Sequence, residues 1–533
     1  MELYKKSDID LVNNHINTIV DKIEVIRKET FPELYQKKEI VNISTENTTD
    51  TDKKEITIED IQDVLDIVMD FVKRKKLKVY GGTSHNTMVV NKNKNDAFYD
   101  PNDIKSRDID CYSTNPLHDL VEFCDLLYNK GYTDVKGSEA VHEETYKVFC
   151  KGWNALDLSY VPSSIFNNIP FTEINGIRYV HPHFAIMDMY RMYTDPINSS
   201  FRWQKTFPRL YVLQKNYPFN IIKSAIGNEY KHNINIDDGL NIIYEFIKNN
   251  KNVYLFGTYA YNILLKESGI KKKYYKQLDV QFYQIVSLSY KSDVRQLVKL
   301  LQTQLNTKDI KVIEYYPFYQ FYDYNCEIVY KGEIIAKIYR YFDRCTPIHQ
   351  IKYNQNNIEY FIQIGCYDYI LLMEMVNAFR EKILQKENYR KYHVIMISHL
   401  IEMRNYYLDK NNKTFLDKSL FQSLMTSCIG KTYDTILKAK EKRKQRKEQG
   451  KMPIFVYKPI RTIKDREFKN TSGNIVNNPQ NLKIPKHNTY SYNKKTSRLK
   501  KSKKSKKSKK SKKSKKSKKS KTNKQRKHKK KST

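Results

Sequence analysis

A segment near residue 80 recurs about 170 residues later, and this repeat constrains the fold more than any other feature of the chain. "KVYGGTSHNTMVV" (78–90) is echoed by "NVYLFGTYAYNILL" (252–265), "SRDIDCY" (106–112) by "QLDVQFY" (277–283), and "NALDLSYVP" (154–162) by "YNCEIVYKG" (324–332). The offsets are similar: 257 − 82 = 175, 279 − 108 = 171 and 327 − 157 = 170. Three echoes in one order predict a duplicated unit of strands and helices; the alternative is two unrelated mixed domains.

The sequence divides into four parts and predicts an α+β fold. Helical spacing of apolar residues over 8–29 and a polar stretch at 44–55 predict an N-terminal helical segment and linker, residues 1–50. The first copy of the repeat is expected at 51–205 and the second at 206–440. The rest, 441–533, is basic and ends in a Lys-Ser repeat that cannot bury a core, so a largely disordered tail is expected there.

The charge of the chain favours a polyanionic partner, either nucleic acid or anionic lipid. The formal net charge is +37; residues 494–533 hold 24 Lys or Arg and no acid, so the remainder carries 37 − 24 = +13. No stretch approaches the roughly 18 apolar residues of a membrane-spanning helix. The seven cysteines form an odd, scattered set without CxxC, which favours a reducing compartment over a disulfide framework.

The first copy has readable local signals. Thr57 and Asp60 predict a capping box, with a helix running to about Arg74. The segments that follow predict a strand at "LKVYGG", a strand at "RDIDCYS", a helix at "NPLHDLVEFCDLLYNKG", two strands around Lys151-Gly152, and a mostly helical stretch from about His183.

Three carboxylates carry the chemical prediction. Asp108 and Asp110 are two residues apart on a predicted strand, so both point to one face, with Ile109 and Cys111 on the core side. Asp157 lies on another predicted strand, in "ALDLSYV", and is expected on the open side. Adjacent carboxylates remain ionised together when a cation lies between them, and oxygen ligands suit Mg²⁺. Three of them could hold two metal ions for displacement at phosphorus.

"GGTSHN", "RDIDCYS" and "ALDLSYV", in this order, resemble the signature of the nucleotidyltransferase superfamily that includes polymerase β-like enzymes. With the short N-terminal part and the second copy, the layout resembles the poly(A) polymerase catalytic subunits of poxviruses and giant DNA viruses. The resemblance implies that Asp108, Asp110 and Asp157 bind two catalytic Mg²⁺ or Mn²⁺ ions. It also implies that Gly81, Gly82 and Ser84 hold the nucleotide phosphates, although Ser84 does not directly follow a glycine.

The second copy is expected to be catalytically inactive. At the positions that its echo assigns to Asp108 and Asp110 it has Asp279 and Gln281, and a neutral Gln cannot bridge two metal ions. By the same echo, Glu327 takes the third acidic position and Phe256 replaces one glycine.

"RWQKTFPRLY" places Arg202, Lys205 and Arg209 among aromatic residues, which suits a triphosphate or single-stranded RNA as well as a basic helix end. The predicted activity is addition of AMP from ATP to the 3′ end of RNA. The alternatives are a CCA- or uridylyl-adding enzyme and a non-catalytic nucleic-acid-binding scaffold. The viral resemblance also implies a homodimer or a small processivity subunit as partner, and a location in the host cytoplasm or virus factory, with packaging in the virion as a further option.

Overall fold

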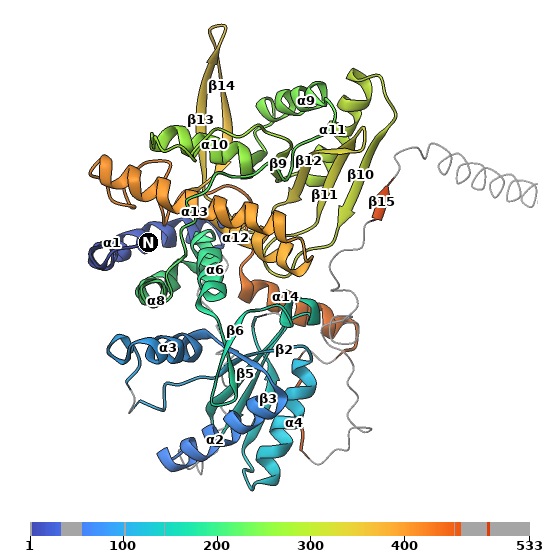
Figure 1. Ribbon diagram of the computed structural model, residues 1–533. Helices are drawn as coiled ribbons and strands as arrows, with labels where there is room; N and C mark the ends of the chain where they lie inside the picture. The colour runs from blue at the N-terminus through green and yellow to red at the C-terminus, as the bar shows by residue number, and fades with distance from the viewer. Residues whose placement is uncertain are drawn as a thin grey trace, which may run out of the picture.

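The computed structural model describes residues 3–32, 56–100, 103–142, 144–451, 454–459 and 488–490. Two β-sheets lie at opposite ends of the molecule, with helices between and around them (Figure 1). This is the mixed α+β fold that the sequence predicts. The polar stretch at 44–55 and the Lys-Ser repeat lie outside the described residues.

The first sheet belongs to the first copy and has seven strands. Their spatial order is β3 (Val135–Glu139), β4 (Thr145–Cys150), β5 (Trp153–Tyr160), β2 (Asp110–Ser113), β1 (Lys78–Tyr80), β7 (Ile177–Val180) and β6 (Phe171–Ile174). Strand β2 is parallel to β5 and antiparallel to β1. The helices of this copy are α2 (Ile58–Lys75), α3 (Gly81–Lys92), η2 (Lys94–Asp96), α4 (Pro116–Asn129), α5 (Ser163–Phe166), α6 (Pro182–Tyr193), α7 (Pro196–Ser199), η3 (Ser200–Arg202) and α8 (Trp203–Asn216).

The second sheet repeats the first strand for strand. Its order is β13 (Ile348–Gln355), β14 (Ile358–Gly365), β8 (Val253–Phe256), β9 (Tyr283–Ser287), β12 (Glu333–Arg340), β11 (Asn325–Tyr330) and β10 (Ile310–Tyr315), with β15 (Asn488–Tyr490) added at the edge. Read from the other end, β10-β11-β12-β9-β8-β14-β13 matches β3-β4-β5-β2-β1-β7-β6, so the predicted duplication is confirmed. The helices here are α9 (Asp237–Lys248), α10 (Gly257–Ser268), α11 (Tyr290–Gln304), α12 (Tyr367–Ile383) and α13 (Glu387–Lys410).

Local signals in the sequence explain how several elements begin. Thr57 accepts the backbone N–H of Asp60, whose side chain accepts from the backbone of Thr57, so the predicted capping box of α2 is confirmed. The predicted N-terminal helix is α1 (Lys6–Thr30). Its buried residues Val12, Ile16 and Ile23 pack in the large apolar core that also holds residues of α6, α8, α12 and α13. One continuous core therefore joins the helical end of the first copy to the second copy. Figure 1 shows α6, α12 and α13 between the two sheets.

The chain returns to the first copy after α13. Helix α14 (Thr435–Glu448) lies at the boundary of the two copies in Figure 1, and Tyr457 is buried in the core of the first sheet. Residues 441–448 and 454–458, which the composition assigns to the basic tail, are therefore part of the folded body. Tyr457 and Phe455 pack into the first core, and Arg446 forms a buried ion pair with Glu139.

One disulfide differs from the expectation of reduced cysteines: Cys345 and Cys428 are joined, with their Cα atoms 5.3 Å apart. The two residues are 83 positions apart, and the bridge between Thr346 and Ile429 brings their neighbours together, so local sequence could not reveal the pair. Among the helices that the structure describes, none has both the length and the apolar character needed to cross a membrane.

Candidate active site

The predicted carboxylates meet in one row across the first sheet. Backbone pairing joins Tyr80 of β1 to Asp110 of β2, Asp110 to Asp157 of β5, and Asp157 to Lys147 of β4. Asp108 lies just before β2, which begins at Asp110 and not at Arg107 as the sequence suggested. Asp108 is fixed there because its carbonyl accepts a hydrogen bond from Thr83 Oγ1 at 2.8 Å. Ile109 and Cys111 are buried on the opposite face, as the alternation predicts.

The carboxylates of this row are buried close to one another, and this shifts their pKa values. Burial, followed by the charges of Asp108 and Asp157, raises the pKa of Asp110 to about 8. Burial also raises the pKa of Asp157, and the Lys147 ammonium, 2.5 Å from Asp157 Oδ2, opposes that shift. Among the residues that the structure describes, none meets the geometry of a hydrogen bond to the buried Asp157 Oδ1, although the Asn154 side chain is close enough to lower the pKa of this carboxyl. Three neighbouring carboxylates with an unpartnered oxygen fit a divalent cation, because oxygen ligands are those that Mg²⁺ prefers.

A second group of potential metal ligands is already paired with protein groups. In the described part of the chain, the side chains whose ligand atoms all lie within 4.8 Å of one another are His118, Asp119 and Glu122 on α4. Lys75 Nζ is 2.8 Å from both Asp119 Oδ1 and Glu122 Oε2. A lysine therefore occupies the position that a cation would take. The aspartate row is more open than this group, so its carboxylates would have to close around an ion.

Glycines bring the backbone close to the acids. Gly81 has φ +70°, in the left-handed region, and a Cβ there would lie 2.2 Å from Asp110 Oδ2. A Cβ on Gly82 would lie 1.9 Å from the Tyr99 hydroxyl and 3.0 Å from Arg209 Nη1. Both glycines occupy the first turn of α3, Gly81 against the Asp110 carboxylate and Gly82 against Tyr99 and Arg209. Ser84 is fully buried, and its Oγ donates to the carbonyl of Val180 at 3.5 Å, so it faces the interior.

The three predicted cations occupy different places around the row. Arg209 Nη2 donates to the Tyr99 hydroxyl at 3.1 Å and stacks over Phe98, which places it beside Gly82. The charge of Lys205 acts on Asp110, since it lowers the pKa of that carboxyl. Arg202 is farther out, where Nη2 lies 3.2 Å from His142 Nε2.

Two features of the site, Lys147 and the stacked rings of Tyr80 and Tyr112, were not identified from the sequence. Lys147 alternates with the buried residues Tyr146 and Val148, so the alternation in "TYKVFC" could have placed it on the open face. Tyr80 and Tyr112 stack with ring centroids 4.0 Å apart, and the Tyr80 hydroxyl lies 2.7 Å from Ser159 Oγ. No sequence motif marks this stacking, because it depends on the pairing of β1 with β2.

In the second copy, the residues that occupy the positions of Tyr80, Asp110, Asp157 and Lys147 are not those that the sequence repeat suggested. Pairing joins Phe256 to Gln284, Gln284 to Lys337, and Lys337 to Glu327. Gln284 therefore corresponds to Asp110, and Phe282 to Asp108; the assignment to Gln281 and Asp279 was wrong. Glu327 corresponds to Lys147, not to Asp157, and Phe256 corresponds to Tyr80, not to a glycine.

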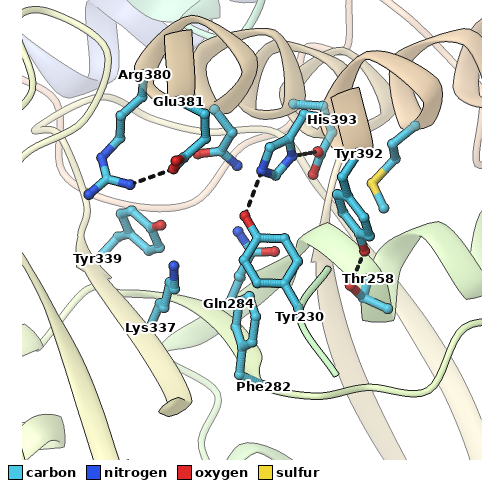
Figure 2. Close-up of a pocket in the computed structure, with 13 residues that line it drawn as sticks. Tyr230, Thr258, Phe282, Gln284, Lys337, Tyr339, Arg380, Glu381, Tyr392 and His393 are labelled. Atoms are coloured by element: carbon cyan, nitrogen blue, oxygen red, sulfur yellow. Dashed lines mark hydrogen bonds and ion pairs between the residues drawn. The ribbon is translucent and has the colours of Figure 1, made fainter. Parts of the chain in front are cut away.

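The ion pair of the row is thus inverted in the second copy. Lys337 stands in the place of Asp157 and lies 3.3 Å from Glu327, and burial lowers its pKa. Figure 2 shows Lys337, Gln284, Phe282 and Thr258 lining one pocket there. The Lys337 ammonium lies 4.9 Å from the centre of the Phe282 ring. A lysine in the row disfavours a divalent cation by like-charge repulsion, so the carboxylates of the first copy are better suited to a divalent cation than this row is.

Comparison with known proteins follows the same division. Residues 66–199 match the family model described as poly(A) polymerase catalytic subunit, and residues 212–486 match the model for the C-terminal part of the APMV poly(A) polymerase catalytic subunit. A protein of Acanthamoeba polyphaga mimivirus named as a poly(A) polymerase catalytic subunit is 31% identical over 469 residues, which cover 80% of this chain and 79% of that protein.

Two further relatives extend the comparison. A protein of the same name from African swine fever virus (isolate Pig/Kenya/KEN-50/1950) is 29% identical over 185 residues, covering 33% of this chain and 38% of that protein. The crystal structure of the Megavirus polyadenylate synthase superposes with a TM-score of 0.69 at 31% identity, over 89% of this chain and 93% of that chain.

Proposed function

The chain belongs to the family of poly(A) polymerase catalytic subunits and is a template-independent polyadenylating enzyme, and we propose that Asp108, Asp110 and Asp157 of its first copy carry the reaction. The reaction transfers AMP from ATP to the 3′ end of RNA, with pyrophosphate as the leaving group. The observation that carries this assignment is the row that joins Tyr80, Asp110, Asp157 and Lys147, with Gly81 directly against Asp110.

We assign two Mg²⁺ or Mn²⁺ ions to the three carboxylates. When bound, such ions activate the 3′ hydroxyl and neutralise the charge of the triphosphate. The protein supplies the ligands: Asp110, which is largely protonated below a pH of about 8, gives up its proton to become a ligand. Asp157 offers its unpartnered Oδ1, while Lys147 holds Oδ2 and fixes the carboxylate plane.

We assign the phosphates of ATP to the first turn of α3 and the cations around it. Backbone N–H groups at a helix N-terminus bind anions, and Gly81 and Gly82 keep that turn free of side chains. Arg209 lies beside Gly82 and can reach a phosphate there, with Lys205 adding positive charge. The buried hydroxyl of Ser84 makes it a support for the turn in this proposal.

The test of the function is extension of a labelled RNA primer with each nucleoside triphosphate separately. We expect ATP to be used in preference to the others. Preference for CTP or UTP would replace the proposal with a CCA- or uridylyl-adding enzyme. The variant Asp108→Ala/Asp110→Ala should lose extension and keep most of its RNA binding; extension by this variant would refute the site.

We further propose that the chain acts on RNA either as a homodimer or with a small processivity subunit, in the host cytoplasm or virus factory. The viral sources of its relatives and the net charge of +37 support this proposal. Light scattering of the purified protein tests self-association, and a monomer that extends RNA processively without a partner would contradict it. Fractionation of infected cells tests the location, and a purely nuclear protein would contradict it.

A further inference from the structure

Helix α14 concentrates positive charge without an apolar face to explain it. Its fourteen residues include seven Lys or Arg and two Glu. Lys440, Lys444 and Lys447 are exposed and lie at helical spacing on one face, which we call the α14 basic face. Like charges four residues apart destabilise a helix. Repulsion between Lys440 and Lys444 therefore opposes the stability of the helix that carries them.

Contacts at its two ends hold α14 in place. At the N-terminus, Asp434 accepts the backbone N–H groups of Ile436 and Leu437 at 2.8 and 3.1 Å, and it pairs with Arg27 at 2.8 Å. At the C-terminus, Arg446 forms a buried ion pair with Glu139 of β3 at 2.9 Å. The chain then continues along β3, where the N–H of Tyr457 donates to the carbonyl of Gly137 at 2.7 Å.

This anchoring sets α14 at the β3 edge of the sheet that carries the acids. Backbone pairing links this segment to the acids: Val456 pairs with Ser138 of β3, Ser138 with Lys147 of β4, and Lys147 with Asp157 of β5. Neighbouring strands are about 4.8 Å apart, so the backbone of Glu139 lies roughly 10 Å from that of Asp157. The Glu139 side chain, like that of the paired Tyr146, points to the opposite face of the sheet. The β3–β4 loop holds His142, which contacts Arg202. Exposed cations near this edge of the sheet therefore include Arg202 and the α14 basic face.

We propose that the α14 basic face binds the phosphate backbone of single-stranded RNA a few nucleotides upstream of the 3′ end that lies at the acids. The inference rests on the proposed function, since it places the rest of the RNA substrate of that site. Lysines are flexible point charges, and binding through them does not depend on base sequence. A membrane surface fits less well, because an interfacial helix needs an apolar face opposite its basic one, and α14 has none.

The experiment measures RNA binding apart from catalysis. Lys440→Gln/Lys444→Gln/Lys447→Gln is compared with Lys291→Gln/Arg295→Gln/Lys299→Gln, which removes the same charge from an exposed face of α11 in the second copy. Fluorescence anisotropy follows binding of an RNA primer whose 3′ end cannot be extended, at several salt concentrations. Three lost phosphate contacts should reduce the slope of log affinity against log salt by about 2, since each contact contributes about 0.7.

The ratio of the RNA affinity of the unmodified protein to that of the α14 variant should accordingly fall about 20-fold between 50 and 200 mM salt. The KM for a long RNA primer should rise in this variant, and the defect should fade with a primer of about three nucleotides, which ends before α14. An unchanged salt slope, or an equal change in the α11 variant, would overturn the proposal. Reduced binding to phosphatidylserine vesicles with unchanged RNA binding would also overturn it.

These outcomes separate the two proposals. If the unmodified protein extends no RNA, the proposed function fails. If it extends RNA and the α14 variant binds and extends long primers as well as the α11 variant does, the α14 assignment alone fails.

Discussion

Replacing Gly81 by alanine separates the architecture of the site from its chemistry, because the chain contains a matched control. Gly81 has φ +70° and Gly257, its counterpart in the second copy, has φ +66°. A Cβ would lie 2.2 Å from Asp110 Oδ2 in the first case and 1.6 Å from Gln284 Oε1 in the second. A left-handed conformation costs about 1–2 kcal/mol for a residue other than glycine. Both variants should therefore lose a similar free energy of unfolding.

The two substitutions should differ in catalysis. Relieving the clash at Gly81 requires the Asp110 carboxylate to move by about 1 Å, and a displacement of that size in reacting groups lowers the rate about 100-fold. In Gly257→Ala the displaced group is the Gln284 amide, which holds no metal ion in our assignment. We expect kcat to fall about 100-fold in Gly81→Ala and to stay near its normal value in Gly257→Ala.

The assay is extension of a labelled RNA primer with ATP at saturating Mg²⁺, together with thermal unfolding of both variants. The reasoning would be refuted if Gly257→Ala lost as much activity as Gly81→Ala at equal stability. Full activity in Gly81→Ala would refute it as well, because Asp110 would then not need its present position.

Three further predictions follow from charges and pKa values in the two copies. Glu327→Gln removes the charged partner of the buried Lys337 ammonium, so the free energy of unfolding measured with urea should fall by about 3–5 kcal/mol. The rate of RNA extension per folded molecule should stay the same. Loss of this activity without loss of stability would contradict the prediction. Asp110, with a pKa raised to about 8, favours the folded metal-free protein at acid pH, and this stabilisation should be lost as the pH rises through about 8. Mg²⁺ binding at pH 7 should accordingly release a proton, measurable by calorimetry in buffers of different ionisation enthalpy, and no release would contradict the shift. Arg209→Gln should raise the KM for ATP about ten-fold in extension kinetics, because a hydrogen bond from a charged group is lost, and an unchanged KM would remove Arg209 from the phosphate site.

Local patterns in the sequence predict the elements that build the site. The capping box of α2, the strand that ends at Gly81, and the strands on either side of Lys151-Gly152 are all confirmed. Strands β3 and β6 could not be read from the sequence: both are edge strands, β6 has no buried residue, and β3, "VKGSE", has a single large apolar residue, Val135. Their existence depends on partners distant in the sequence.

The sequence could not predict the register of the strands, which decides which residues pair across neighbouring strands. "QLDVQFY" resembles "SRDIDCY" in spelling, but β9 begins at Tyr283, after most of that echo, so every inferred equivalence in it was displaced. The pairing of Lys147 with Asp157 likewise depends on the antiparallel register of β4 and β5, which contains an irregularity at Val148 and Phe149. Cross-strand neighbours are set by backbone hydrogen bonds, and no single strand records them.

The corrected register strengthens the case that only the first copy is catalytic. The second copy keeps the scaffold next to the row: Ser113 Oγ donates to Asp119 Oδ2 at 2.5 Å, and Ser287 Oγ donates to Asp293 Oδ2 at the same distance. It changes the acidic positions, where Phe282, Gln284 and Lys337 replace Asp108, Asp110 and Asp157. A fold that needed the acids for its own stability would not retain this scaffold after losing them. The paired Lys337 and Glu327 supply an internal cation and anion in the second copy, whereas the acids of the first copy exceed the cations beside them and need an external one.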